Sequence, residues 1–219
     1  NPDAATGGAD VETMAVVLSR GPALLRHRRL ALTERDVEAI AVESSPAVVR
    51  AKAVGAVDRF GRPSPGEVRI VIVPRDGSAR PDPGAGLLAV VRDAIVAASP
   101  AVAAPRVTVE RPAYVPIGVA VTVIPLASSE AGPVRERAQA ALDVFMHPLT
   151  GGPDTTGWDF GRGVHISDVA RVLESVPGVD AVRNLMLTRD DVPVGDSALV
   201  RDDQIVCAGP IVVRLGGSD

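Results

Sequence analysis

The chain has 219 residues, of which 46% are hydrophobic and 23% are charged, as in a globular protein with one large domain or two small ones. Its formal net charge is −4, from 23 basic and 27 acidic residues, which argues against the clustered basic surface of a nucleic-acid-binding protein. A single cysteine, Cys207, excludes an intrachain disulfide and a cysteine metal cluster, and no apolar run approaches the length of a membrane span. Aromatic residues make up only 2% of the chain, so aliphatic side chains have to fill the core.

The first 30 residues are expected to form a polar tail and a helical segment. Apolar residues at helical spacing predict a helix over residues 11–25. It is interrupted at Gly21-Pro22, because proline lacks the N–H that a helix interior needs. An extended or loop passage follows over residues 26–32. Two interpretations, a solvated cluster and a charged contact to an acidic partner surface, are open for its three arginines: Arg26, Arg28 and Arg29.

The next 80 or so residues are expected to contain two helices and three strands. Thr33 is expected to cap the first helix, and Asp36 stands where its carboxylate can complete a capping box. Residues 68–73 are mostly β-branched and lie between turn residues, which is the strongest strand pattern in the chain. In chain order, the predicted elements are a helix from Thr33 to residue 43, a strand over 48–57, a turn over 58–66, a strand over 67–74, a helix over 87–98 and a strand over 107–109.

The C-terminal half is predicted to contain strands, two helices and one long loop. Pro133 fits the first turn of a helix, where its missing N–H costs little. Ser167 is expected to be the N-cap of a later helix that Pro177-Gly178 terminates. Between these helices lies a loop over residues 147–163, and loops of this length are usually functional or interface elements. In chain order, the predicted elements are a strand over 114–126, a helix ending near 145, a helix over 167–174, a strand over 179–187, and a strand pair or single bent strand over 204–215.

Together these elements predict an α+β fold built from two small modules. The pattern from Thr33 to Val48 resembles the pattern from Ser167 to Val179, and the strand and helix of 68–98 resemble those of 119–145. Because strands and helices do not alternate strictly, the sheets are expected to be mostly antiparallel or mixed, with helices packed on one face. The expected division is an N-terminal tail and helical segment over 1–30, a first module over 31–112 and a second module over 113–219.

The long loop contains Trp158 and Phe160, two of the five aromatic residues of the chain, between glycines. One interpretation is that they fill the base of their own domain. The other is that they anchor a neighbouring subunit, with Arg162 pairing with an acidic group or a carbonyl, because aromatic and arginine residues dominate interface hot spots. On the second interpretation Trp158→Ala impairs assembly more than folding, and loss of the thermal transition of the isolated protein would show that Trp158 belongs to the core.

No pattern in the chain predicts catalysis or cofactor binding. Ser167 and Asp168 are neighbours of a histidine, but no G-x-S-x-G elbow occurs, and both residues are expected to serve the start of a helix. Gly84 and Gly86 precede a helix, yet the third glycine and the Lys-Ser/Thr pair of a phosphate loop are missing. A structural or solvated role is expected for the three histidines, whose spacing does not suit a metal: His27, His147 and His165. The chain is therefore not expected to be an enzyme or to hold a cofactor.

One stretch carries a family resemblance, GWDFGRGVHISDVARVLESVPGVDAVRNLML, residues 157–187. It resembles the C-terminal part of baseplate J-like proteins, whose typical run is a G-W-x-F-G-R loop, a short helix, V-P-G-V and a strand. Residues 145–152, FMHPLTGG, resemble the end of the helix that precedes this loop in the family. Upstream, residues 24–33, LLRHRRLALT, resemble the family's R-x-R-x-V-T segment, and residues 45–51, SPAVVRA, resemble the segment that follows it.

The resemblance implies a non-enzymatic structural subunit of the baseplate wedge of a contractile phage tail or contractile injection system. Such a subunit would hold other wedge proteins and further copies of itself, and would relay their rearrangement on contraction. It would need no cofactor, nucleic acid, membrane insertion or small-molecule substrate. It would be assembled in the cytoplasm and become part of a phage tail or tail-like particle. The alternative is a small-ligand-binding regulatory module, because paired α+β sandwiches often serve that role.

Overall fold

The computed structural model describes residues 30–57, 60, 62–100, 106–127 and 130–217, and in addition residues 14 and 18. The predicted helix over 11–25 lies outside these ranges apart from Met14 and Leu18. The candidate interface residues Arg26, Arg28 and Arg29 also lie outside the described residues, so their role stays a prediction.

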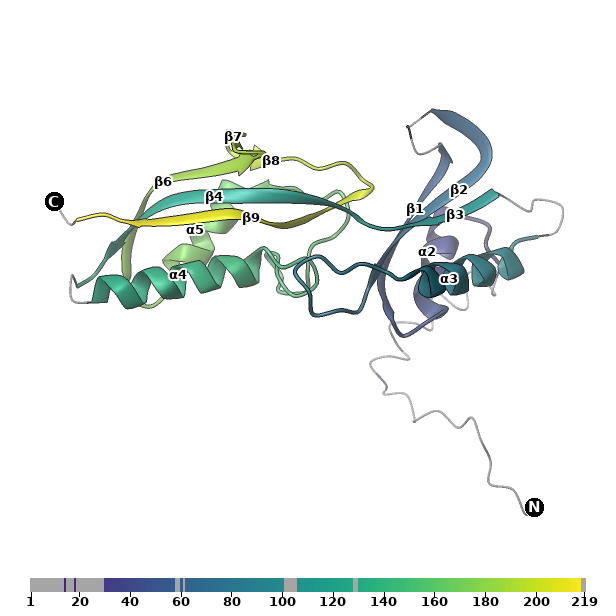
Figure 1. The fold of residues 1–219 in the computed structure, drawn as a ribbon, viewed down its shortest axis with the longest axis horizontal. Coiled ribbons are helices and arrows are strands. Elements are labelled where there is room, and N and C mark those ends of the chain that lie inside the picture. Colours follow the sequence, from purple (N-terminus) through teal and green to yellow (C-terminus); the bar gives the residue numbers. More distant parts are fainter. Residues whose placement is uncertain are drawn as a thin grey trace, which may run out of the picture.

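The first sheet has three strands in the order β1-β2-β3, and two helices cover one of its faces (Figure 1). The central strand, β2, pairs antiparallel with β1 and parallel with β3. The core is aliphatic, as the composition requires, since Ile70 and Ile72 are buried together with Ile40, Val91 and Ile95 of the helices. The elements are α2 (Glu34–Glu43), β1 (Val48–Val57), β2 (Pro63–Pro74), α3 (Ala85–Ala98) and β3 (Arg106–Glu110).

The second sheet has four strands in the order β7-β6-β4-β9, and its helices also cover one face (Figure 1). Alternate residues of the central strand β4, from Val115 to Val123, point into the core, as the period of two in its sequence predicts. A separate two-stranded ladder joins β5 to β8. The elements are β4 (Ala113–Pro125), α4 (Ala131–Phe145), β5 (Val164–His165), α5 (Ile166–Glu174), β6 (Val179–Arg189), β7 (Val192–Pro193), β8 (Ser197–Ala198) and β9 (Gln204–Leu215).

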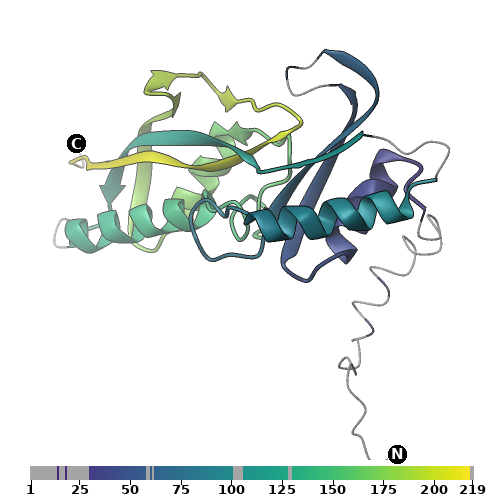
Figure 2. The same cartoon turned by 45° about the vertical axis from the view of Figure 1, so that its right-hand side comes forward.

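The two sheets share one arrangement of parts. Each central strand, β2 or β4, has an antiparallel neighbour on one side, β1 or β6, and a parallel neighbour on the other, β3 or β9. In each half one helix follows the central strand and another precedes the antiparallel strand, although the order along the chain differs. Figure 2 shows α3 and α4 on the same side of the two sheets. The internal resemblance in the sequence therefore matches a repeated local architecture.

The predicted α+β fold class is confirmed, with mixed sheets and helices on one face of each. The capping box at the start of α2 is also confirmed. The backbone N–H of Thr33 donates to Asp36 Oδ2 at 2.9 Å, and the N–H of Asp36 donates to Thr33 Oγ1 at 3.3 Å. Both groups lie within one turn of the chain, so sequence alone suffices to place this helix start.

Two local predictions differ from the structure, and a third, which left two alternatives open, is decided by it. Ser167 is not the N-cap of α5, because the helix already begins at Ile166 and its N–H donates to the carbonyl of Asp196 at 2.9 Å. The first N–H of the helix therefore has a tertiary acceptor, and no side chain caps the helix start. Residues 63–66, predicted as turn, belong to β2, where Pro63 pairs with Val57. For residues 204–215, where a strand pair and a single strand were both open, the structure shows the single strand β9, with a register shift at Gly209-Pro210.

α4, with 15 residues, is the longest of the described helices, and none of them combines the length and apolar character that crossing a bilayer requires.

Candidate interface site

The loop of residues 147–163 is held closely against the end of α4 by its own backbone. Gly151 N donates to His147 O at 2.9 Å, Gly152 N to Phe145 O at 2.8 Å, and Trp158 N to Pro148 O at 2.9 Å. His147 adds side-chain bonds, since its Nδ1 lies 3.2 Å from Leu149 N and 3.3 Å from Thr150 N. The imidazole therefore has the structural role expected for it, and the loop is a folded part of the second half.

Trp158 lies wholly inside this loop, with 0% of its surface exposed. Its ring stands edge-on to Phe145, with centroids 5.3 Å apart and an interplanar angle of 78°. Its Nε1–H donates to the carbonyl of Phe145 at 2.9 Å, so the buried polar atom is satisfied. Of the two interpretations, the structure places the indole in the core, where it offers no surface to a neighbouring subunit.

Gly151 is essential to the same packing because no side chain fits there. A Cβ at this position would lie 2.1 Å from Phe145 O, a backbone atom that cannot move aside cheaply. We expect Gly151→Ala to lower the free energy of unfolding by about 2–3 kcal/mol, as measured by urea denaturation. In the matched control, Gly132→Ala, the new methyl group meets nothing within 4 Å, and we expect a change within about 1 kcal/mol. Equal losses of unfolding free energy in the two variants would show that the lack of space at Gly151 is unimportant.

The outer part of the loop is joined to the first sheet through Arg50 of β1. Its guanidinium forms an ion pair with Asp159, and its Nη2 donates to the carbonyl of Thr156 at 2.5 Å. The Arg162 Nη1 lies 2.8 Å from Asp154 Oδ2, so its charge is paired within the loop itself. Phe160 is half-buried and packs against the apolar core of the second sheet. Contacts of Phe160 and Arg162 with a neighbouring subunit stay a prediction.

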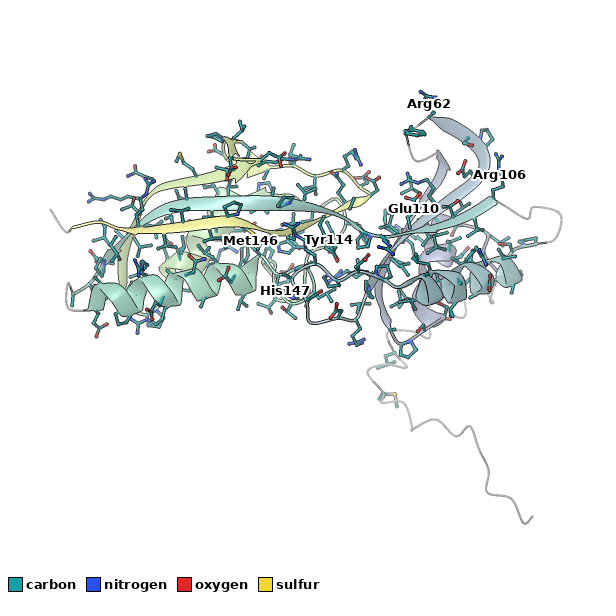
Figure 3. All side chains as sticks on the ribbon, in the orientation of Figure 1. Arg62, Arg106, Glu110, Tyr114, Met146 and His147 are labelled. Carbon is teal, nitrogen blue, oxygen red and sulfur yellow. The ribbon has the colours of Figure 1, made fainter. Side chains whose placement is uncertain are left out.

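A second bridge between the halves surrounds Arg69 of β2, whose side chain is 8% exposed. Its Nε and Nη2 donate to the two carboxylate oxygens of Glu110 at 3.2 and 2.8 Å, and Nη2 also lies 3.8 Å from Asp203 Oδ2. Asp203 immediately precedes β9, so one guanidinium links strands of both sheets. Figure 3 shows Glu110 and Tyr114 on the stretch where the chain passes from one sheet to the other.

Tyr114 completes this junction from the start of β4. Its hydroxyl donates to the carbonyl of Pro81 at 2.7 Å, and the neighbouring Arg111 pairs with Asp82 at 2.8 Å. Burial, with smaller contributions from nearby negative groups, raises the pKa of Tyr114 far above its usual value. The hydroxyl therefore stays protonated and remains a hydrogen-bond donor throughout the physiological pH range.

An open apolar groove lies between α4, α5 and the loop. Its volume is about 420 Å³, and its walls include Ala141, Val144, Pro153 and Val172. Val144 is 63% exposed. Asp168 and Arg171, which form an ion pair at 3.4 Å, stand at its rim.

The turn between β1 and β2, predicted from the sequence, carries an exposed pair that the sequence did not single out, Phe60 and Arg62. Phe60 is 70% exposed, and the guanidinium of Arg62 lies 5.7 Å from the centre of its ring. Figure 3 shows Arg62 at the tip of this turn, on the side away from the helices. The available signal was an aromatic residue and an arginine within a glycine- and proline-rich turn.

The described residues do not gather into a recognisable catalytic centre. His165 and Ser167 both lie on the surface at the start of α5. Among the described parts of the chain, no group of three or more His, Cys, Asp and Glu side chains is placed to hold a metal. Cys207 is buried in β9, and burial raises the pKa of its thiol while Arg80 opposes the shift.

Comparison with known proteins gives a match to a solved structure. No family model and no curated protein sequence matches the chain. A chain in the cryo-EM structure of the anti-feeding prophage (AFP) baseplate, 6-fold symmetrised, has a similar fold, with a TM-score of 0.69 and 20% sequence identity. The match covers 95% of this chain and 43% of that one, so this chain spans less than half the length of the matched protein. The protein therefore has a fold that occurs in the baseplate of the anti-feeding prophage.

Proposed function

We propose that the chain is a non-enzymatic structural subunit of the baseplate wedge of a contractile tail or contractile injection system. The observation that carries this proposal is the fold similarity over 95% of the chain to a protein of the anti-feeding prophage baseplate. The resemblance of residues 24–33, 45–51, 145–152 and 157–187, in this order, to baseplate J-like proteins supports the same function from the sequence alone.

The junction between the two sheets supports a mechanical role. The Arg50–Asp159 pair, the Arg69 cluster and the Tyr114–Pro81 hydrogen bond restrain one half relative to the other at separate points. Buried, hydrogen-bonded charges cost much more to separate than exposed ones. We infer that the two halves move together, and that rearrangement during contraction takes place at contacts with neighbouring wedge proteins or further copies of the chain.

A small-ligand-binding regulatory module is the second candidate function. The apolar groove beside Val144 supports it, because about 420 Å³ lies within the usual size range of ligand pockets. Screening a library of apolar small molecules by thermal shift separates the two functions. A ligand that raises the melting temperature of the wild type but not of Val144→Asp would favour the regulatory module.

The baseplate proposal is tested by removing the chain from cells that make the particle. We expect purified particles to contain the chain at a constant ratio to other baseplate proteins, as measured by quantitative mass spectrometry. Deletion is expected to reduce intact sheathed particles at least ten-fold in electron micrographs, and expression from a plasmid is expected to restore them. Particles of normal number and shape that lack the chain would overturn the proposal.

A further inference from the structure

β9 is an edge strand, and its second half has a free side. In the order β7-β6-β4-β9, no described strand pairs with the far side of β9. The pairing with β4 is regular from Ile211 to Leu215, and Gly216 N continues it by donating to Val123 O at 3.0 Å. Backbone groups alternate in direction along a strand. The N–H and C=O groups of Ile211, Val213 and Leu215 therefore point away from β4, toward the free side.

Two other stretches of strand edge are blocked by nearby groups, unlike the second half of β9. Along the free side of β1, Glu38 Oε1 accepts from Ala53 N at 3.1 Å, and Glu34 Oε1 accepts from Gly55 N at 3.0 Å. At the beginning of β9, the carbonyl of Gln204 accepts from Gly161 N at 3.0 Å. Proteins commonly block strand edges in this way, because an open edge pairs with other chains. Residues 211–215, with the β-branched sequence Ile-Val-Val, are left without such protection among the described residues.

A groove runs beside this open edge and gives it the shape of a strand-binding site. The groove measures about 510 Å³ and lies between residues 211–213 of β9 and one flank of α4. The helix side is polar and mixed in charge, with Arg135, Glu136 and Asp143. On the strand, Val212 is 44% and Leu215 is 39% exposed. A groove between a strand edge and a helix suits an extended peptide. The peptide backbone can form hydrogen bonds with the edge strand while its side chains contact the helix.

The position of α4 argues against a second copy of the chain as the occupant. α4 packs on β9 more extensively than on β4, so the helix lies beneath the edge strand itself. If β9 paired with β9 of a second copy, the strands would lie about 4.8 Å apart, and the two α4 helices would be forced to a similar spacing. Packed helices need about 8–10 Å between their axes. The space admits a strand with no helix beneath it.

We propose that residues 211–215 of β9 bind an extended segment of a different protein, which becomes the fifth strand of the second sheet. This proposal rests on the proposed function, since the neighbour is then another protein of the baseplate. Arg214 is exposed on the open face of the sheet. The added segment therefore places an acidic side chain beside Arg214 and polar side chains toward α4, with backbone hydrogen bonds supplying most of the affinity.

The test replaces Leu215 in the chain that is assembled into particles. Leu215→Pro removes the backbone N–H that points away from β4, and its ring hinders the approach of another strand. Leu215→Ala also shortens the side chain but keeps this N–H. We expect the alanine variant to be incorporated normally and the proline variant to be reduced at least ten-fold in purified particles. Circular dichroism of both isolated variants checks that they fold, and a Val213→Pro variant replaces Leu215→Pro if the latter is unfolded.

Hydrogen exchange provides a second readout on the unsubstituted protein. We expect the amides of Val213 and Leu215 to exchange at least ten-fold more slowly in the particle than in the isolated chain. Equal incorporation of the two Leu215 variants, or unchanged exchange in particles that contain the chain, would overturn the inference. So would protection of these amides in a dimer of the isolated chain, because the occupant would then be a second copy. Absence of the unsubstituted chain from particles would instead overturn the proposed function, and this inference with it.

Discussion

Trp158→Ala is expected to lower the free energy of unfolding by about 3–5 kcal/mol, one of the two largest effects for a single side chain in this protein. The change removes a fully buried indole, its edge-on contact with Phe145 and the only side-chain donor to the Phe145 carbonyl among the described hydrogen bonds. The resulting cavity lies where the loop of residues 147–163 packs against the end of α4. If neighbouring atoms moved in to fill this cavity, the backbone of the loop would be displaced. Urea denaturation followed by circular dichroism measures the loss.

The control for this change is Trp158→Phe, which keeps an aromatic ring but leaves the Phe145 carbonyl without its indole donor. We expect a smaller loss of about 1–3 kcal/mol, from one hydrogen bond and a smaller ring, because the Phe145 carbonyl still accepts from Gly152 N at 2.8 Å. The sequence left open that Trp158 anchors a neighbour, in which case the alanine variant would impair assembly more than folding. An alanine variant that unfolds at the same urea concentration as the wild type yet is missing from particles would support that role and contradict the core assignment.

Arg69→Met is expected to lower the free energy of unfolding by about 3 kcal/mol, the second of the two large effects. Methionine retains much of the length and apolar contact of the side chain but removes the charge that faces Glu110 and Asp203. Both carboxylates are mostly buried, with side chains 27% and 19% exposed. Glu110 would lose its cation, whereas Asp203 would keep Arg201, whose Nε lies 3.1 Å from its Oδ1. Thermal or urea unfolding of the isolated protein measures the effect.

The matched control for the buried pair is Arg111→Ala at the same junction. Arg111 and Asp82 are each more than half exposed, and an exposed pair of this kind contributes no more than about 1 kcal/mol. A double variant, Arg69→Met with Glu110→Gln, should recover part of the stability, because the uncompensated charge of Glu110 is then removed. Equal losses in Arg69→Met and Arg111→Ala would show that burial of the Arg69 cluster is unimportant.

The candidate site was only partly predictable. The loop of residues 147–163 was identified from its length and its two aromatic residues, and it does occupy the junction between the halves. Its interface role is untested, and Trp158 lies in the core. The exposed Phe60 of the β1–β2 turn and the open edge of β9 were missed. A single aromatic residue in a turn does not by itself predict an exposed contact site. The order of strands within a sheet cannot be read from the local sequence.

The division into modules over 31–112 and 113–219 also stays a prediction. The two sheets and two apolar clusters meet near residues 111–112, but Val73 of β2 is buried in the core of the second half. The boundary between the two sheets is therefore not by itself the boundary of an independently folding unit.

The sequence by itself determined what depends on neighbours within a few residues. The capping box of Thr33 and Asp36, the alternating valines of β4 and the aliphatic cores follow from hydrogen bonds three residues apart, from the period of the strand and from composition. Only the tertiary structure decided that Arg50 meets Asp159, 109 residues later, and that β9 pairs with β4 and lies at an edge of the second sheet. The physical reason is that such contacts depend on which strands pair and in what order, and many arrangements satisfy the same local pattern equally well.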